Sequence, residues 1–160
     1  MPCYLFTYHA YGSWLPDRKQ GYVKRHQGIL PQDMQKHGLY AKAMTEEIVN
    51  FSSEHQRCII ESLIKSQTPQ RFELHYVATD PTHVHALLAW RDDRNVVAMP
   101  GLVKGSISRE LNAAMKRRTW LSEGGSRKQV RNREHFDYLM TTYLPKHSGW
   151  KWSVAKRFHR

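Results

Sequence analysis

Two neighbouring stretches with a period of two constrain the fold of this chain more than any other sequence feature. Within residues 72–78 every second side chain is apolar, which is the alternation of a half-buried strand. Asp80 and Pro81 then favour a turn, and a second strand is predicted from about residue 83 to residue 90. Because the connection is so short, the two strands are expected to pair as an antiparallel hairpin.

The flanking segments predict two more strands and three helices. The expected strands span Tyr4 to His9 and about Thr119 to Leu121, and the expected helices span about 45–65, 96–115 and 133–144. Thr45 is the candidate N-cap of the first helix, with two glutamates in its first turn, and residues 67–70 are expected to end it. Pro100 and Gly101 are expected to delay the start of the second helix. Residues 18–44, which are polar and rich in Gly, His and Gln, are predicted to form a long loop.

The resulting order of elements, β-α-β-β-α-β-α, predicts the α+β class. It matches a split βαβ sandwich, in which an antiparallel sheet carries helices on one face and a further helix follows at the C-terminus. A chain of 160 residues fits a single domain, 1–160. No apolar run approaches the roughly 18 residues that span a bilayer, and the first residues lack the pattern of a signal peptide. The sequence therefore predicts a cytoplasmic protein without a membrane segment.

Positive charge is concentrated in the last 60 residues of the chain. Residues 101–160 hold 14 basic and 4 acidic side chains, whereas residues 1–100 hold 11 and 10, so +10 of the net +11 lies in the C-terminal part. Such an asymmetry suits a polyanionic partner, because Lys and Arg displace condensed counterions from a phosphate backbone. A solvated basic face that only aids solubility is the simpler alternative.

The second strand of the hairpin carries a candidate metal site. His83 and His85 are two residues apart, and on a strand such residues point to the same face. The opposite face, with Val84, Ala86 and Leu88, is expected to pack against helices and to leave both histidines free to bind an ion. Two half-exposed strand histidines without a ligand are the structural alternative.

A candidate nucleophile lies near the end of the last predicted helix. Tyr143 and His147 are spaced i, i+4, so one helical face would present both side chains. A phenol oxygen is a weak nucleophile at neutral pH, but it can attack phosphorus when a metal polarises the phosphate. Alternatively, Tyr143 continues the apolar stripe of Phe136, Leu139 and Met140 and is plain core.

This combination of a strand-borne His-hydrophobic-His motif and a late helical tyrosine resembles the HUH single-tyrosine transposases, including the REP-associated tyrosine transposases. The segments that carry the resemblance, in the same order as in that family, are Thr7 to Leu15, Tyr76 to Leu88, Lys104 to Leu111 and Trp120 to Arg127. The resemblance implies a ferredoxin-like (RRM-like) fold and a divalent metal, Mg²⁺ or Mn²⁺, held by His83, His85 and a residue one turn past the tyrosine. It also implies cleavage and rejoining of single-stranded DNA through a 5′-phosphotyrosyl link. The expected DNA substrate contains a hairpin. Related enzymes include homodimers that exchange the tyrosine helix, as well as monomers.

Two features depart from the family pattern. The third ligand in similar proteins is usually Gln or Asn, whereas this chain offers His147, with Ser148 as a weaker substitute. Pro145 lies between the nucleophile and the proposed ligand, where it removes an amide donor and should end or kink the helix. Tyr138 is the rival nucleophile, but Thr142 would then occupy the ligand position, and threonine is a poor metal ligand.

The remaining cations are predicted to contact the phosphates of DNA rather than to take part in chemistry. These residues are Lys104, Arg109, Arg117, Arg118, Arg127, Lys128, Arg131 and Arg133. Four tryptophans, Trp14, Trp120, Trp150 and Trp152, could stack on unpaired bases, although packing explains each of them equally well.

Two further functions remain open from the sequence. One is a non-catalytic nucleic-acid-binding module on the same scaffold, which would bind DNA without needing His85 or Tyr143. The other is a protein in which the metal is purely structural, which a chelator would destabilise independently of DNA.

Overall fold

The computed structural model describes residues 1–13, 22–24, 28–30 and 46–160. Its main sheet has six antiparallel strands in the order β6-β1-β5-β4-β7-β8. The strands are β1 (Cys3–His9), β4 (Phe72–Thr79), β5 (His83–Trp90), β6 (Ser126–Gln129), β7 (Lys151–Ser153) and β8 (Arg157–His159). The helices are α2 (Ser53–Gln70), α3 (Met99–Ala114) and α4 (Arg133–Tyr138), which continues as a π-helical turn (Leu139–Tyr143) and a 3-10 turn (Leu144–Lys146).

The α+β class and the antiparallel hairpin are confirmed. β4 and β5 pair with one bulge between Leu74 and Tyr76. In the sheet, β5 lies between β1 and β4, and helix α2 lies between these same two strands in the sequence. This is the split βαβ arrangement that the order of elements predicted. Two strands, β7 and β8, extend the sheet beyond the predicted four, because three-residue strands leave too short a pattern to be recognised in sequence.

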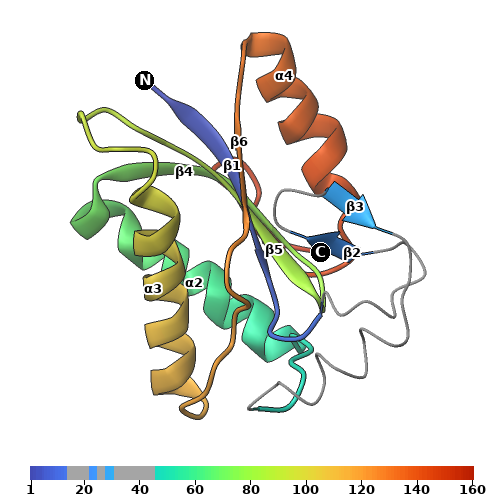
Figure 1. Ribbon diagram of the computed structural model, residues 1–160. Helices are drawn as coiled ribbons and strands as arrows, with labels where there is room; N and C mark the ends of the chain where they lie inside the picture. Colours follow the sequence, from blue (N-terminus) through green and yellow to red (C-terminus); the bar gives the residue numbers. More distant parts are fainter. Residues whose placement is uncertain (14–21, 25–27, 31–45) are drawn as a thin grey trace.

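Helices cover both faces of the sheet (Figure 1). On one face α2 and α3 pack together over Phe6, Val84, Ala86 and Leu88, which form the larger hydrophobic core. The other face carries a smaller cluster that includes Leu5, Tyr76, Ala78, Leu87, Leu139 and Leu144 and lies under the C-terminal helical segment. Alternate residues of β5 therefore pack into different cores, and this alternation directs the histidines toward the C-terminal helix.

The first helix begins later than predicted. Val49 and Phe51 donate backbone hydrogen bonds to Tyr11 and Pro81 at 2.8 and 2.7 Å, so this segment is extended. Ser52 is the N-cap, and it forms a reciprocal capping box with His55. The two glutamates at 46 and 47 therefore lie outside the first turn, and the predicted cap, Thr45, lies outside the described residues.

The first helix also ends later than predicted. Residues 67–70 remain helical, with Pro69 in the last turn, and the chain leaves the helix at Arg71 in the left-handed region (φ 52°). The second helix begins at Met99 with Pro100 in its first turn, as Pro100 and Gly101 predicted.

The segment after α3 differs from the prediction. Instead of a strand at 119–121, Leu121 forms an isolated bridge with Ala10, and the strand follows the glycines as β6. β6 is exposed along its whole length, so it has no apolar alternation from which it could be predicted. Gly125, at φ 130°, sits so close to Thr7 O that a Cβ atom would clash with it.

Within the predicted loop 18–44, strands β2 (Tyr22–Lys24) and β3 (Gly28–Leu30) form a separate two-stranded sheet. The rest of that stretch lies outside the described residues. Of the helices in the described part of the chain, none is long and apolar enough to cross a membrane.

Candidate metal centre and tyrosine

Strand β5 places His83 and His85 on the face that the C-terminal helical segment covers. In the register of β1, His9 lies opposite His83 and Thr7 opposite His85. His85 is just 4% exposed. His83, the first residue of β5, keeps more contact with solvent.

The C-terminal helix changes its geometry immediately after α4, and this brings the third histidine into place. Leu144 donates its amide to Leu139 O, an i→i−5 bond that closes the π turn. Pro145 lacks an amide and starts the 3-10 turn, after which His147 is extended (φ −66°, ψ 141°). The prediction that Pro145 ends the helix is confirmed, and the chain turns so that the His147 ring lies over the sheet.

The three histidines form one compact cluster. One ligand nitrogen from each of His83, His85 and His147 lies within 4.8 Å of the others. The ring centroids are 4.9 Å apart for His83 and His85, 5.3 Å for His83 and His147, and 4.5 Å for His85 and His147. These residues could hold a metal ion, and they form the arrangement that was predicted from the sequence.

The hydrogen bonds of the cluster suit metal binding. His147 Nδ1 donates to Asp80 Oδ2 at 2.6 Å, while its Nε2 is buried and has no partner among the described residues. His85 Nδ1 is hydrogen-bonded to Thr7 Oγ1 at 2.7 Å, and His83 Nδ1 to Thr82 Oγ1 at 3.0 Å. Metal-binding histidines typically have their other nitrogen fixed in this way by an oxygen. A buried imidazole nitrogen without a partner is the atom that an ion would satisfy.

Burial keeps the central imidazole neutral. Burial, together with smaller contributions from the neighbouring His147 and His83, lowers the pKa of His85 to about 3. At neutral pH the ring therefore has a lone pair for an ion. For Asp80, burial alone would raise the pKa, but hydrogen bonds from His147 and Ser148 outweigh it and lower the pKa of this carboxyl.

Tyr143 lies against the cluster in the same chain. Its ring centroid is 5.5 Å from the ring of His85 and 5.5 Å from that of His147. Burial raises the pKa of its phenol, and the nearby Tyr138 and Asp80 add to this. The hydroxyl thus keeps its proton at neutral pH. Tyr143 also packs at the margin of the smaller core, as the core alternative predicted, and its role as a nucleophile stays a prediction.

Two other candidates from the sequence lie in different surroundings. Tyr138 is half exposed, and its ring is 6.4 Å from that of Tyr143. Ser148 donates its backbone N–H and its hydroxyl to Asp80 Oδ1, at 2.8 and 2.7 Å. The serine thus supports the carboxylate rather than joining the three histidines.

The loop that carries His147 is tightly fixed by groups that the sequence analysis did not identify. The buried Lys151 donates to the carbonyl oxygens of His147 and Gly149 at 2.7 and 3.2 Å. Gln56 Oε1 accepts from Trp150 N at 3.0 Å, and Gly149 N donates to Thr79 O at 3.0 Å. The position of Asp80, three residues before His83, is the one signal in the sequence that could have revealed a supporting residue.

Four of the eight predicted phosphate contacts hold other parts of the protein. Lys104 donates to Ser122 O at 2.6 Å, and Arg109 to Ser106 Oγ at 3.1 Å. Arg118 contacts Glu46 and the carbonyl of Glu47, and exposed Arg133 pairs with Asp137 at 2.9 Å. The partly buried Lys104 and Arg118 are therefore structural links.

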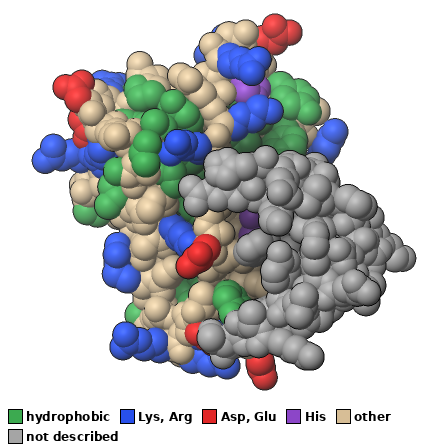
Figure 2. Space-filling view, in the orientation of Figure 1, with side chains coloured by type: hydrophobic (Ala, Val, Ile, Leu, Met, Phe, Trp, Pro, Cys, Tyr) green, Lys and Arg blue, Asp and Glu red, His purple; other side chains and the backbone are tan. Residues whose placement is uncertain are grey.

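The other four, Arg117, Arg127, Lys128 and Arg131, are exposed. In the register of β6, Lys128 lies opposite Leu5, which faces the smaller core, so Lys128 shares its sheet face with the cluster. Figure 2 shows that Lys and Arg side chains are spread around this view rather than gathered in one patch.

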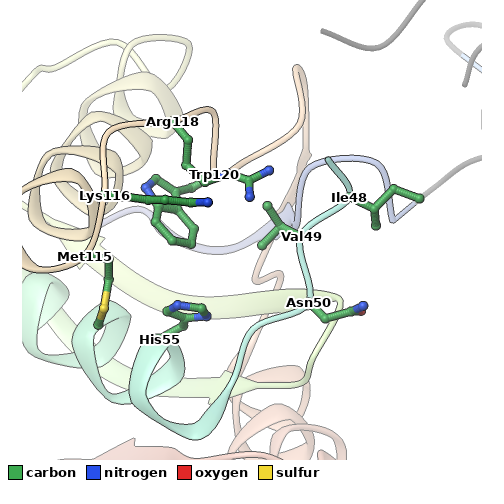
Figure 3. Close-up of a pocket in the computed structure, with 8 residues that line it drawn as sticks. All are labelled: Ile48, Val49, Asn50, His55, Met115, Lys116, Arg118 and Trp120. Atoms are coloured by element: carbon green, nitrogen blue, oxygen red, sulfur yellow. The ribbon is translucent and has the colours of Figure 1, made fainter. Parts of the chain in front are cut away.

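The described tryptophans are mainly packing residues. Trp120 and Trp152 are buried, and the guanidinium groups of Arg57 and Arg160 each lie 5.3 Å from the Trp150 ring. Trp14 lies outside the described residues. A pocket of about 420 Å³ adjoins Trp120, with Arg118 above the ring and His55 below it (Figure 3). It contains neither the three histidines nor Tyr143.

No family model matches the sequence, and no curated protein matches it. Among solved structures, the chain is similar to a REP-associated tyrosine transposase bound to a REP hairpin, with 12% identity and a TM-score of 0.49 over 87% of this chain and 62% of the other. It thus spans less than two thirds of that protein. It is also similar to a candidate transposase from Deinococcus radiodurans R1, with 14% identity and a TM-score of 0.48 over 93% of both chains. Both of these proteins are transposases by name.

Proposed function

We propose that the chain is a metal-dependent strand transferase of the transposase type, which cleaves and rejoins single-stranded DNA with Tyr143 as its nucleophile. The observation that carries the proposal is the convergence of Tyr143 on His83, His85 and His147 within one chain. A core tyrosine needs apolar neighbours. It does not need three imidazoles, one of which has an unpartnered buried nitrogen.

In the proposed reaction, Tyr143 Oη attacks the phosphorus of a phosphodiester. The bond from phosphorus to the 3′ oxygen breaks, and the DNA 5′-phosphate remains on the tyrosine. Overall, the phenolic proton passes to the leaving 3′ oxygen, so no further reactant is consumed. Because one phosphodiester replaces another, a free 3′-hydroxyl can reverse the step at a new junction.

The imidazoles of His83, His85 and His147 would hold a divalent ion. When bound, the ion supplies Lewis-acid polarisation of the phosphate and stabilises the charge that develops on it. Such help is needed because burial raises the pKa of Tyr143, which leaves the phenol protonated and weakly nucleophilic. The half-buried position of Tyr143 also limits the access of water, which favours transfer to DNA over hydrolysis.

The proposed substrate is single-stranded DNA, with a hairpin as the sequence resemblance implies. The exposed Arg117, Arg127, Lys128 and Arg131 are the proposed phosphate contacts, because their side chains hold no other described group. A cytoplasmic location and a homodimer that exchanges the tyrosine helix stay predictions from the sequence.

Covalent trapping tests this function. We expect hairpin-bearing single strands and a divalent metal to give an adduct that survives denaturation, and Tyr143→Phe to abolish it. Tyr138→Phe is the matched control and should retain the adduct, since its ring is half exposed and five residues away. Salt-sensitive DNA binding that persists without any adduct would support the binding-module alternative instead.

A further inference from the structure

The candidate centre is composed of imidazoles alone. The group within ligand distance contains His83, His85 and His147 and no carboxylate. Both oxygens of the nearest carboxylate, Asp80, are engaged elsewhere, Oδ1 with Ser148 and Oδ2 with His147 Nδ1. Asp80 Oδ2 also lies 3.3 Å from His83 Nε2. Asp80 therefore contacts two of the rings, but it is not among the residues of the group within ligand distance.

Imidazole ligands discriminate between divalent ions. Mg²⁺ requires nearly ideal octahedral oxygen coordination and is usually bound through carboxylates, phosphates and water. Imidazole nitrogen is a softer ligand that suits Co²⁺, Ni²⁺ and Zn²⁺, whereas Mn²⁺, like Mg²⁺, is better matched by oxygen ligands, and affinity generally rises from Mn²⁺ toward Cu²⁺. Substituting a neutral amide oxygen for His147 would move the set toward the preference of Mg²⁺.

The third imidazole is also preorganised. His147 Nδ1 is hydrogen-bonded to Asp80 Oδ2 at 2.6 Å. Because a carboxylate can only accept, this bond fixes the proton of His147 on Nδ1 and leaves Nε2 as the ligand atom. Ser148 anchors the same carboxylate twice, and Lys151 holds the backbone of His147 from the other side. A metal would therefore meet a ring that is already oriented.

We propose that this centre selects a borderline transition-metal ion of the class of Co²⁺, Ni²⁺ and Zn²⁺ over Mg²⁺, and that Asp80 is the positioning residue that holds His147 for it. The inference deepens the proposed function because it concerns the same centre. It does not depend on DNA cleavage.

Metal binding without DNA tests the selectivity. The protein is stripped with a chelator, titrated with Co²⁺ in a calorimeter, and titrated again in Mg²⁺ at about a thousandfold excess over Co²⁺. We expect one Co²⁺ per chain and less than a threefold loss of Co²⁺ affinity in Mg²⁺. His147→Gln should weaken Co²⁺ binding at least about tenfold. A loss of Co²⁺ affinity of threefold or more in this Mg²⁺ excess would overturn the inference, and so would a His147→Gln variant that binds Co²⁺ like the parent.

Asp80→Asn tests the positioning role. The amide keeps the size of the side chain but cannot accept at both atoms, so we expect Co²⁺ affinity to fall about 10- to 100-fold. Asp93→Asn, on the exposed turn after β5, is the matched control and should bind like the parent. Thermal unfolding of metal-free protein shows whether Asp80→Asn is folded. If it is not, Thr7→Val tests whether a hydrogen bond to the non-ligand nitrogen supports metal binding at His85. Unchanged binding in a folded Asp80→Asn variant would contradict the positioning role.

These outcomes separate from those of the proposed function. Tyr143→Phe should bind Co²⁺ like the parent. If the parent protein binds metal selectively but never forms a DNA adduct, strand transfer is contradicted and the metal selectivity is not. An adduct that forms equally well in Mg²⁺ would count against the selectivity alone.

Discussion

At the scale of single residues, oxygen atoms next to the histidines decide what the cluster can bind. Asp80 Oδ2 can only accept, so it holds the proton of His147 on Nδ1 and leaves Nε2 as the ligand atom. Thr7 Oγ1 is hydrogen-bonded to Nδ1 of His85, which leaves Nε2 as the atom of that ring that can bind an ion. Neither oxygen belongs to the His-hydrophobic-His motif. The motif brings two rings to one face, and its neighbours determine how the rings are oriented.

Thr7→Val should weaken metal binding without unfolding the protein. Valine has the shape of threonine but cannot hydrogen-bond to His85 Nδ1, so the ring loses its orientation. We expect about tenfold weaker Co²⁺ binding by calorimetry. The exposed Thr142→Val is the control, and equal affinities for the two variants would show that the Thr7 hydroxyl does not matter.

Gly149→Ala should destabilise the fold. A Cβ atom at this buried position would overlap Thr79 O and Gln56 Oε1, two groups that fix the His147 loop. We expect the melting temperature to fall by roughly 5–10 °C in a calorimetric scan. Gly101→Ala, where a Cβ meets nothing within 4 Å, should change it little. A melting temperature that does not change at Gly149 would mean that the loop can shift without loss.

At the scale of elements, the end of the C-terminal helix determines the site. An uninterrupted α-helix would carry residue 147 onward along its axis, whereas the π turn and the 3-10 turn end it at Lys146. Tyr143 is thus the last residue of the π turn, and His147 is the first extended residue. The irregular helix separates the nucleophile from the ligand while keeping their rings 5.5 Å apart.

Pro145→Ala tests this role of the helix end. Alanine restores an amide donor and removes the clash with the preceding turn, so the helix should extend and turn His147 away from β5. We expect unchanged or slightly higher helicity by circular dichroism, together with Co²⁺ affinity that falls at least about tenfold. Pro100→Ala, in the first turn of α3, should leave affinity unchanged. Parental affinity in Pro145→Ala would show that the loop contacts suffice to place His147.

The sequence predicted the elements whose side chains alternate between core and solvent. β4 and β5 were predictable because their apolar period is strong, and the pairing of His83 with His85 followed from the same period. β6 was not, since its side chains are all exposed. The start of α2 was misplaced because Val49 and Phe51 make backbone bonds to residues distant in sequence. Thr7 and Lys151 support the site through tertiary contacts that no local pattern encodes, whereas Asp80, three residues before His83, had a signal in the sequence.

At the scale of the whole molecule, the excess positive charge has two different roles. Lys104 and Arg118 are partly buried and bind Ser122 O and Glu46, respectively. The side chains of Arg117, Arg127, Lys128 and Arg131 are exposed. A count of cations along the chain cannot separate these groups. These four exposed side chains can bind DNA phosphates and release their counterions without breaking contacts that stabilise the fold.

Lys128→Ala and Lys104→Ala should therefore differ. For Lys128→Ala we expect a few-fold loss of single-strand affinity and a salt dependence reduced by about one phosphate contact, with an unchanged melting temperature. Lys104→Ala should lower the melting temperature, because it removes the hydrogen bond that links α3 to Ser122 O. Fluorescence anisotropy at several salt concentrations measures the first effect, and the reverse pattern would refute the assignment.

The central claim is that Tyr143 carries the DNA during strand transfer. The most direct measurement is mass spectrometry of the covalent adduct after nuclease and protease digestion, which locates the nucleotide on a single residue. The account predicts a 5′-phosphonucleotide on Tyr143, formed only when a divalent metal is present. A nucleotide on Tyr138 or any other residue, or no adduct with any hairpin-bearing strand and any metal of the proposed class, would contradict it.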